Sequence, residues 1–229
     1  MLMFFKSVSV SLMVSSLVLF STFTGASKPK VQTMILNGSN FTSLVGEVND
    51  ASVTAVINDI NNADPSKVFY LYIDSPGGEV IAGNRLVEFL QGTDVKVEVI
   101  AQTAASMAAV ITESVKVRHM TSTGFLMFHH IQGGASGDIE QVKARVKFAE
   151  ELQAILYKIV ATRLGVSIEE ITRLIGFEWF LNSDSALKAN AIDDVVKVRC
   201  DNSITKLKKK VQVPTPFGYA EREVPVCPL

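Results

Sequence analysis

Residues 67–78, KVFYLYIDSPGG, decide the fold. Residues 67–74 are nearly all apolar, β-branched or aromatic, which is typical of a strand that is covered on both faces. Two glycines then mark a turn, and a helix is expected through residues 80–92, VIAGNRLVEFLQG, ending near Gly92. A strand, a glycine-rich turn and a helix in this order are the unit of an α/β protein with largely parallel pairing.

The same pattern recurs on both sides of this stretch. The predicted strands are residues 94–100, 115–120 and 124–130, and the predicted helices are residues 52–63 and 104–113. The longest predicted helix runs from Asp138 to Leu164, where apolar residues recur every three or four positions before Gly165. A chain of 229 residues is long enough for one such domain, which we place at residues 27–199, with residues 200–229 as a surface extension.

Composition excludes several classes of function. The formal net charge is -1, so there is no electrostatic reason to expect a nucleic-acid partner. The three histidines and two cysteines do not have the spacing of a zinc site. We therefore expect a protein that works without a metal or another cofactor.

Residues 1–26 have the organisation of a secretory signal peptide. Lys6 is followed by an uncharged stretch over residues 7–23, and the small residues Thr24 and Ala26 precede a cleavage site. We expect an exported protein, either periplasmic or secreted. The alternative is an uncleaved membrane anchor formed by residues 7–23, a stretch near the lower length limit for spanning a bilayer.

Export affects how the cysteines and two asparagines are interpreted. Cys200 and Cys227, 27 residues apart, are candidates for a disulfide because an oxidising compartment allows them to pair, although two free thiols remain the alternative. Asn37 and Asn40 begin the sequences NGS and NFT, which fit the glycosylation pattern of exported proteins.

Ser106 is the candidate nucleophile. It lies in TAASMAA, residues 103–109, where small neighbours leave its hydroxyl accessible. A serine hydroxyl needs a base to take its proton. His129 and His130 end an apolar strand and precede a glycine-containing loop, a position that suits an active-site base in an α/β fold. Because strand side chains alternate, one histidine should point inward and the other outward, so we expect one base.

Acyl transfer also requires donors for the oxyanion of the tetrahedral intermediate. Ser106 lies near the start of a short predicted helix, where the first N–H groups have no intrahelical partner, so the Met107 N–H is one candidate. The turn SPGG, residues 75–78, is the second, because glycine lets the backbone approach a substrate closely. The N–H of Gly78 is the expected donor there.

Four motifs in this order resemble the proteolytic subunit of the Clp protease. They are LYIDSPGG, AASMAA, LMFHHIQGG and FEWFLNSDSALKANAIDDVV, within residues 34–198. The resemblance implies the ClpP/crotonase-type spiral of βαβ units, with a long protruding handle helix from Asp138. It implies a serine-type endopeptidase that cleaves peptides or unfolded polypeptides. Ser106 then corresponds to the nucleophile, His129 to the base, and Gly78 and Met107 to the oxyanion-hole donors.

The resemblance also implies a ring-like homo-oligomer assembled through the handle helix. The sequence departs from the family pattern at three positions: Glu178 replaces the aspartate of the triad, Gln102 replaces a glycine before the serine motif, and Ile131 replaces a proline after the base. A glutamate can still orient an imidazole. An exported protein would lack ATP, so we do not expect an unfolding ATPase as partner.

Three alternatives remain. In a serine–lysine peptidase of the signal-peptide-peptidase or membrane ClpP-class kind, a lysine such as Lys143 or Lys147 on the long helix would be the base. In a non-catalytic scaffold, Glu178 and Gln102 would mark a decayed site. A thioester enzyme of the crotonase type shares the fold, but no acidic pair in a CoA-binding context supports it.

Overall fold

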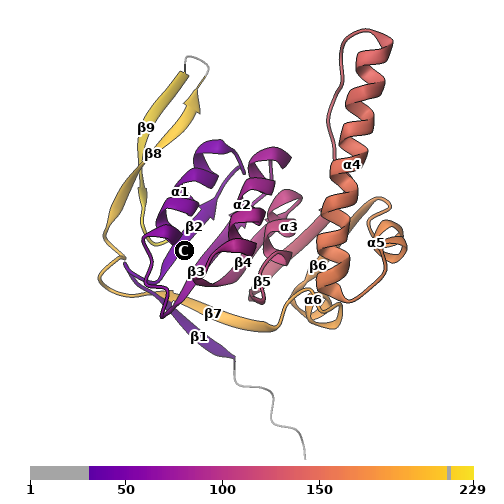
Figure 1. Ribbon diagram of the computed structural model, residues 1–229. Helices are drawn as coiled ribbons and strands as arrows, with labels where there is room; N and C mark the ends of the chain where they lie inside the picture. The colour runs from indigo at the N-terminus through magenta and orange to yellow at the C-terminus, as the bar shows by residue number, and fades with distance from the viewer. Residues whose placement is uncertain (1–30, 216–217) are drawn as a thin grey trace, which may run out of the picture. The chain divides into compact units, whose positions relative to one another are not determined.

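A seven-stranded sheet organises the residues that the computed structural model describes, 31–215 and 218–229 (Figure 1). Its strands are β1 (Gln32–Leu36), β2 (Phe41–Val45), β3 (Val68–Ser75), β4 (Lys96–Ala105), β5 (Val117–His129), β6 (Glu178–Asn182) and β7 (Asp194–Cys200). The strand order is β1-β7-β5-β4-β3-β2 with parallel pairs throughout, and β6 pairs antiparallel with β5. The expected α/β architecture is confirmed.

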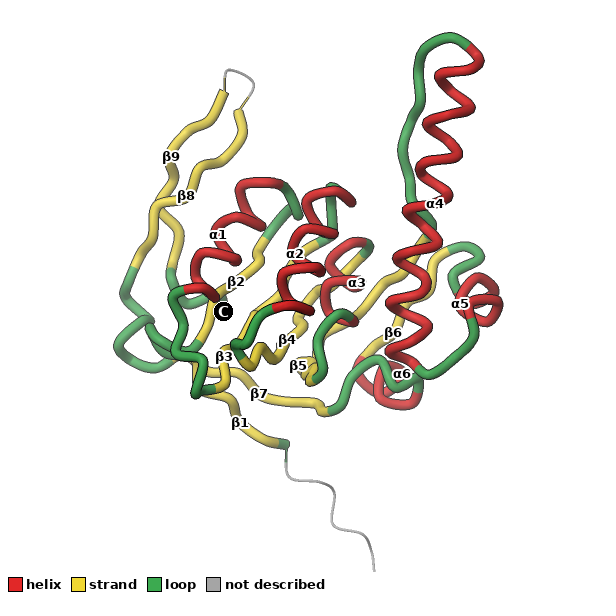
Figure 2. Tube along the Cα trace, in the orientation of Figure 1, coloured by secondary structure: helices red, strands yellow, loops and turns green. Residues whose placement is uncertain are grey.

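The helices of residues 31–229 follow the expected order. They are α1 (Asp50–Asn61), α2 (Val80–Gly92), α3 (Met107–Glu113), α4 (Ile139–Leu164), α5 (Ile168–Leu174) and α6 (Ser183–Lys188). Figure 2 shows α1, α2 and α3 side by side along one face of the sheet. The main apolar core fills the space between these helices, the second half of α4 and the strands.

Two predicted strands are one strand in the structure. Residues 115–120 and 124–130 were expected as separate elements, but β5 runs from Val117 to His129. Met120 pairs with Ala101 and Phe125 pairs with Thr103, so β5 has extra residues across from β4 at this point. The polar residues between the two apolar runs therefore form an irregularity inside a continuous strand, as β-bulges do. Similarly, Ala104 and Ala105 extend β4, and the short helix begins only at Met107.

The helix α4 begins and ends where its cap residues predict. Asp138 accepts a hydrogen bond from the Gln141 N–H at 2.9 Å in a capping box, and Gly165 has a left-handed φ of 75° after the last turn. The side chains buried by the rest of the chain lie in its second half, for example Leu156 and Val160. Ile139, on the first turn, is 73% exposed. The first half of the predicted apolar face is thus uncovered by the described residues.

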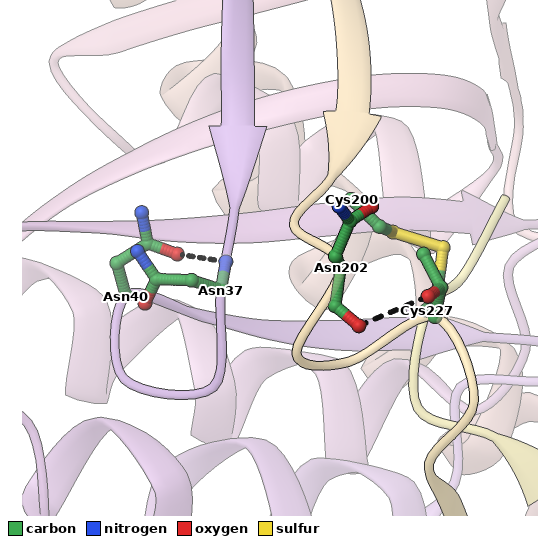
Figure 3. The surroundings of a disulfide bond; sticks show 6 residues. Asn37, Asn40, Cys200, Asn202 and Cys227 are labelled. Atoms are coloured by element: carbon green, nitrogen blue, oxygen red, sulfur yellow. Dashed lines mark hydrogen bonds between the residues drawn. A yellow bond between two sulfur atoms is a disulfide. The ribbon is translucent and has the colours of Figure 1, made fainter.

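The C-terminal extension packs partly onto the sheet. Ile204 is 1% exposed and joins a second apolar cluster with Tyr72 and Ile100. The strands β8 (Lys208–Thr215) and β9 (Gly218–Pro225) then form an antiparallel hairpin. A disulfide joins Cys200 and Cys227, beside the turn between β1 and β2 that carries Asn37 and Asn40 (Figure 3).

The predicted signal peptide, residues 1–26, and the alternative membrane anchor, residues 7–23, both lie outside the described residues. Within the part of the chain that is described, none of the helices has the length and apolar character needed to span a bilayer.

Candidate active site

The backbone at Ser106 forms a sharp turn between β4 and α3. Its φ of 56° and ψ of -124° lie in a region that residues other than glycine seldom adopt, and such strain clusters at functional sites. The Ser106 N–H donates to the Met127 carbonyl at 2.8 Å, and the Ser106 carbonyl accepts from Ala109. The turn is therefore held on both sides of the serine, which fixes where its hydroxyl points.

The small residues around Ser106 allow another turn to lie against it. Gly77, in the SPGG turn, has a φ of 96°, and a Cβ there would lie 2.6 Å from the Ser106 Cβ and 2.7 Å from the Ala105 carbonyl oxygen. The buried Ser75 Oγ accepts from the Gly77 N–H at 3.1 Å and holds this turn in place. Gly77 was not among the predicted site residues, although the glycine pair in SPGG was the available signal.

His129 is within hydrogen-bonding distance of Ser106. The His129 Nε2 lies 2.6 Å from the Ser106 Oγ, across 23 positions of sequence. Burial lowers the pKa of His129, while the nearby Glu178 carboxylate opposes this effect and His130 adds to it. A neutral imidazole can accept a proton, so this distance and this direction of the His129 pKa suit a serine nucleophile and its base.

Glu178 lies opposite His129 in the pairing of β6 with β5. Residues directly opposite in an antiparallel pair project from the same face, with Cβ atoms roughly 4.5–5.5 Å apart. The Glu178 residue is exposed, and the buried Nδ1 of His129 has no hydrogen-bond partner among the described residues. Glu178 therefore lies opposite His129, but no hydrogen bond joins its carboxylate to the His129 Nδ1.

The two predicted oxyanion donors lie on the same cavity as Ser106. Met107 is the first residue of α3, where an N–H has no acceptor within the helix. Around Gly78, the Gly77 carbonyl accepts from the Val48 N–H at 2.8 Å and the Glu79 N–H donates to the Val48 carbonyl at 2.8 Å. Neither bond uses the Gly78 N–H.

The cavity has a volume of about 370 Å³ and contains every predicted catalytic residue. Its wall also includes His130, which was expected to point away from His129. His130 lies beyond the end of β5, where the alternation of strand side chains no longer applies. His130 Nδ1 pairs with the buried hydroxyl of Tyr157 at 2.5 Å. Tyr157 was missed because it lies off the apolar stripe predicted for α4.

The remaining sequence candidates lie away from the reacting atoms. Lys143 and Lys147 are exposed on α4, pair with Glu140 and Glu151, and do not line the cavity. Gln102 accepts a hydrogen bond from the Thr121 hydroxyl at 2.5 Å. Among the described residues, no group of three or more His, Cys, Asp or Glu side chains is suited to hold a metal ion. A larger cavity of about 820 Å³, next to Asn37 and Asp59, contains none of the predicted catalytic residues.

Comparison with known proteins identifies similar chains. A family model described as Clp protease matches residues 26–199. ATP-dependent Clp protease proteolytic subunit 1 of Borreliella burgdorferi is 29% identical over 159 residues, which are 67% of this chain and 82% of the relative. The proteolytic subunits of Borreliella afzelii and Borrelia garinii subsp. bavariensis are each 28% identical over 159 residues, covering 67% of this chain and 81% and 82% of the relatives.

Proposed function

This chain belongs to the Clp protease family, and from that premise we propose that it is a serine endopeptidase with Ser106 as nucleophile and His129 as general base. The observation that supports the assignment most strongly is the 2.6 Å distance between the Ser106 Oγ and the His129 Nε2. The strained turn at Ser106 and the lowered pKa of His129 are consistent with it.

The proposed reaction follows the course of other serine peptidases. His129 Nε2 takes the hydroxyl proton as the Ser106 Oγ attacks the carbonyl carbon of the scissile peptide bond. The N–H groups of Gly78 and Met107 stabilise the oxyanion that forms. His129 then gives its proton to the leaving amine, and the C–N bond breaks to leave an acyl-enzyme. Water hydrolyses this ester by the same steps, which regenerates Ser106.

Glu178 is the proposed third member of the site. Its carboxylate would accept a hydrogen bond from the His129 Nδ1–H, which would fix the tautomer and stabilise the imidazolium. The pairing of Glu178 with His129 across β5 and β6, and the absence of another partner for Nδ1 among the described residues, support this role. Since Glu178 is exposed and longer than aspartate, its side chain has to turn toward the imidazole to make the bond.

Peptides and unfolded polypeptides are the proposed substrates, and a ring-like homo-oligomer is the proposed assembly. The uncovered apolar side chains on the first half of α4, such as Val146 and Phe148, support contacts between copies through this helix. The relatives are named subunits of an ATP-dependent protease. We do not extend ATP dependence to this chain, because residues 1–26 have the features of a signal peptide and an exported protein would lack ATP.

Hydrolysis of an unfolded peptide by the purified protein tests the proposal. Ser106→Ala should lower kcat/KM by roughly 10³-fold or more, because loss of the nucleophile removes most of the catalysis. The folded fraction and the assembly should be unchanged, as judged by circular dichroism and sedimentation. Lys158→Ala, an exposed position on α4 outside the cavity, serves as a matched control and should cleave like the wild type.

The same assay separates the alternatives. Activity that survives His129→Ala and is lost in Lys143→Ala or Lys147→Ala would assign the base to a lysine and overturn the histidine mechanism. A wild-type protein that assembles but neither cleaves peptides nor reacts at Ser106 with a fluorophosphonate would be a scaffold. The exposed Glu178 is the observation that favours this second candidate.

A further inference from the structure

Many of the side chains that line the cavity at Ser106 are apolar. Its apolar lining includes Val110, Met127, Phe128, Leu156, Val160 and Ile175. A side chain next to an attacked carbonyl is joined to that carbonyl by one carbon, so it has to enter a space that borders the nucleophile. This cavity is therefore where the residue preceding the scissile bond would lie.

The polar side chains that α4 contributes to this wall already have protein partners. The Gln153 Oε1 accepts a hydrogen bond from the Ile131 N–H at 3.0 Å, which ties α4 to the segment that follows β5. The Tyr157 hydroxyl pairs with the His130 Nδ1, and their ring centroids lie 6.0 Å apart. The Gln153 Oε1 and the Tyr157 hydroxyl are thus already hydrogen-bonded within the protein before a substrate side chain enters.

The hydrogen bond between Tyr157 and His130 lies inside the protein. Tyr157 is 6% exposed, burial raises the pKa of its phenol, and its hydroxyl lies 2.5 Å from the His130 Nδ1. Tyr157 has two side-chain torsions, and a hydrogen bond at the far end of the ring restrains both.

We propose that Tyr157, held in place by His130, limits the size of the substrate side chain that this cavity accepts. The inference rests on the proposed function and assigns the site a preference that favours medium aliphatic side chains such as leucine over tryptophan. Tyr157 is the bulkiest side chain that α4 places on this wall, and it comes from a buried part of the helix that cannot move aside easily. His130 acts through Tyr157 and is a positioning residue.

The test compares two peptides that differ only in leucine or tryptophan before the scissile bond. Replacing the ring with a smaller side chain, Tyr157→Leu, should raise the ratio of kcat/KM for tryptophan over leucine by about 10- to 100-fold, the range that a change of pocket size can supply. His130→Ala should shift the ratio in the same direction by less, and the double variant should match Tyr157→Leu alone. Lys158→Leu, next to Tyr157 but outside the cavity, should leave the ratio unchanged.

The outcomes of this test separate a failure of the proposed role of Tyr157 from a failure of the proposed peptidase function. A wild type that cleaves both peptides, together with a ratio that stays within twofold in Tyr157→Leu, would refute the role of Tyr157 and leave the peptidase intact. Equal and additive effects of the two single variants would refute the claim that His130 acts through Tyr157. If the wild type cleaves no peptide at all, the proposed function and this inference fail together. Thermal unfolding of each variant shows whether it folds. A partly unfolded fraction lowers kcat/KM for both peptides by the same factor, so the ratio of the two values does not change.

Discussion

Substituting Gly77 with alanine should inactivate the site without touching a catalytic side chain. The new Cβ would lie 2.6 Å from the Ser106 Cβ, 2.7 Å from the Ala105 carbonyl oxygen and 3.0 Å from the Met107 nitrogen. Two of these contacts are backbone atoms of the turn that carries the nucleophile. The Gly77 φ of 96° also lies outside the range that side chains normally permit.

The expected magnitude combines two effects. A residue other than glycine at this φ costs about 1–3 kcal/mol. Forcing an extra methyl group into a packed region costs roughly 1–3 kcal/mol more, so the free energy of unfolding should fall by about 2–6 kcal/mol. Ala108 and Ala109 behind the turn are fully buried, so the strain should be relieved mainly by movement of Ser106. A displacement of about 1 Å at the nucleophile lowers the rate on the order of 100-fold.

Denaturant unfolding and peptide hydrolysis measure the two consequences separately. Gly92→Ala is the matched control, since a Cβ there meets nothing within 4 Å and the backbone φ is ordinary; both measurements should stay close to wild type. If Gly77→Ala were as stable and as active as Gly92→Ala, the close approach of the SPGG turn to Ser106 would not support the site, and the reasoning would be wrong.

Two further predictions follow from the same structure. Glu178→Gln should lower kcat/KM by at least tenfold at neutral pH, because only a carboxylate stabilises the imidazolium of His129, and Glu178→Asp should retain more activity. If Glu178→Gln were as active as the wild type in the peptide assay, Glu178 would have no part in the mechanism. Replacing Cys200 and Cys227 with serine should lower the free energy of unfolding by about 3.5 kcal/mol, the loop-closure value for their separation of 27 residues. Adding a reductant to the wild type should have a similar effect. An unchanged denaturation midpoint in both experiments would contradict a stabilising role of the disulfide.

The sequence predicted the parallel sheet because its strands are apolar runs followed by glycine-rich or polar turns. It also placed His129 at the end of a strand, where β5 ends, but it put Ser106 in a short helix, whereas Ser106 follows directly after the end of β4. Strand ends at one edge of a parallel sheet lie close together, so this proximity depends on local patterns that can be seen without coordinates.

Other features depend on contacts that no local pattern carries. The polar residues between Met120 and Phe125 resemble a turn, but β5 pairs with β4 on both sides of them and with β7 as far as Thr121, so they lie within one strand. Gly77, and not Gly78, lies against Ser106. Which of the two glycines does so depends on how the SPGG turn packs against a turn that is distant in the sequence. The pairing of His130 with Tyr157 joins positions 27 residues apart and depends on where α4 crosses the end of β5.

The rate at which a fluorophosphonate acylates Ser106, measured against pH, tests the central claim most directly. His129 must be neutral to accept the proton, and burial lowers its pKa, so the rate should rise with pH to a plateau with a midpoint below the ordinary histidine value of about 6.5. In His129→Ala the rise should disappear and the plateau rate should fall by at least 100-fold, as loss of a general base predicts. A His129→Ala protein that reacts at Ser106 as fast as wild type, with the same pH dependence, would contradict the account.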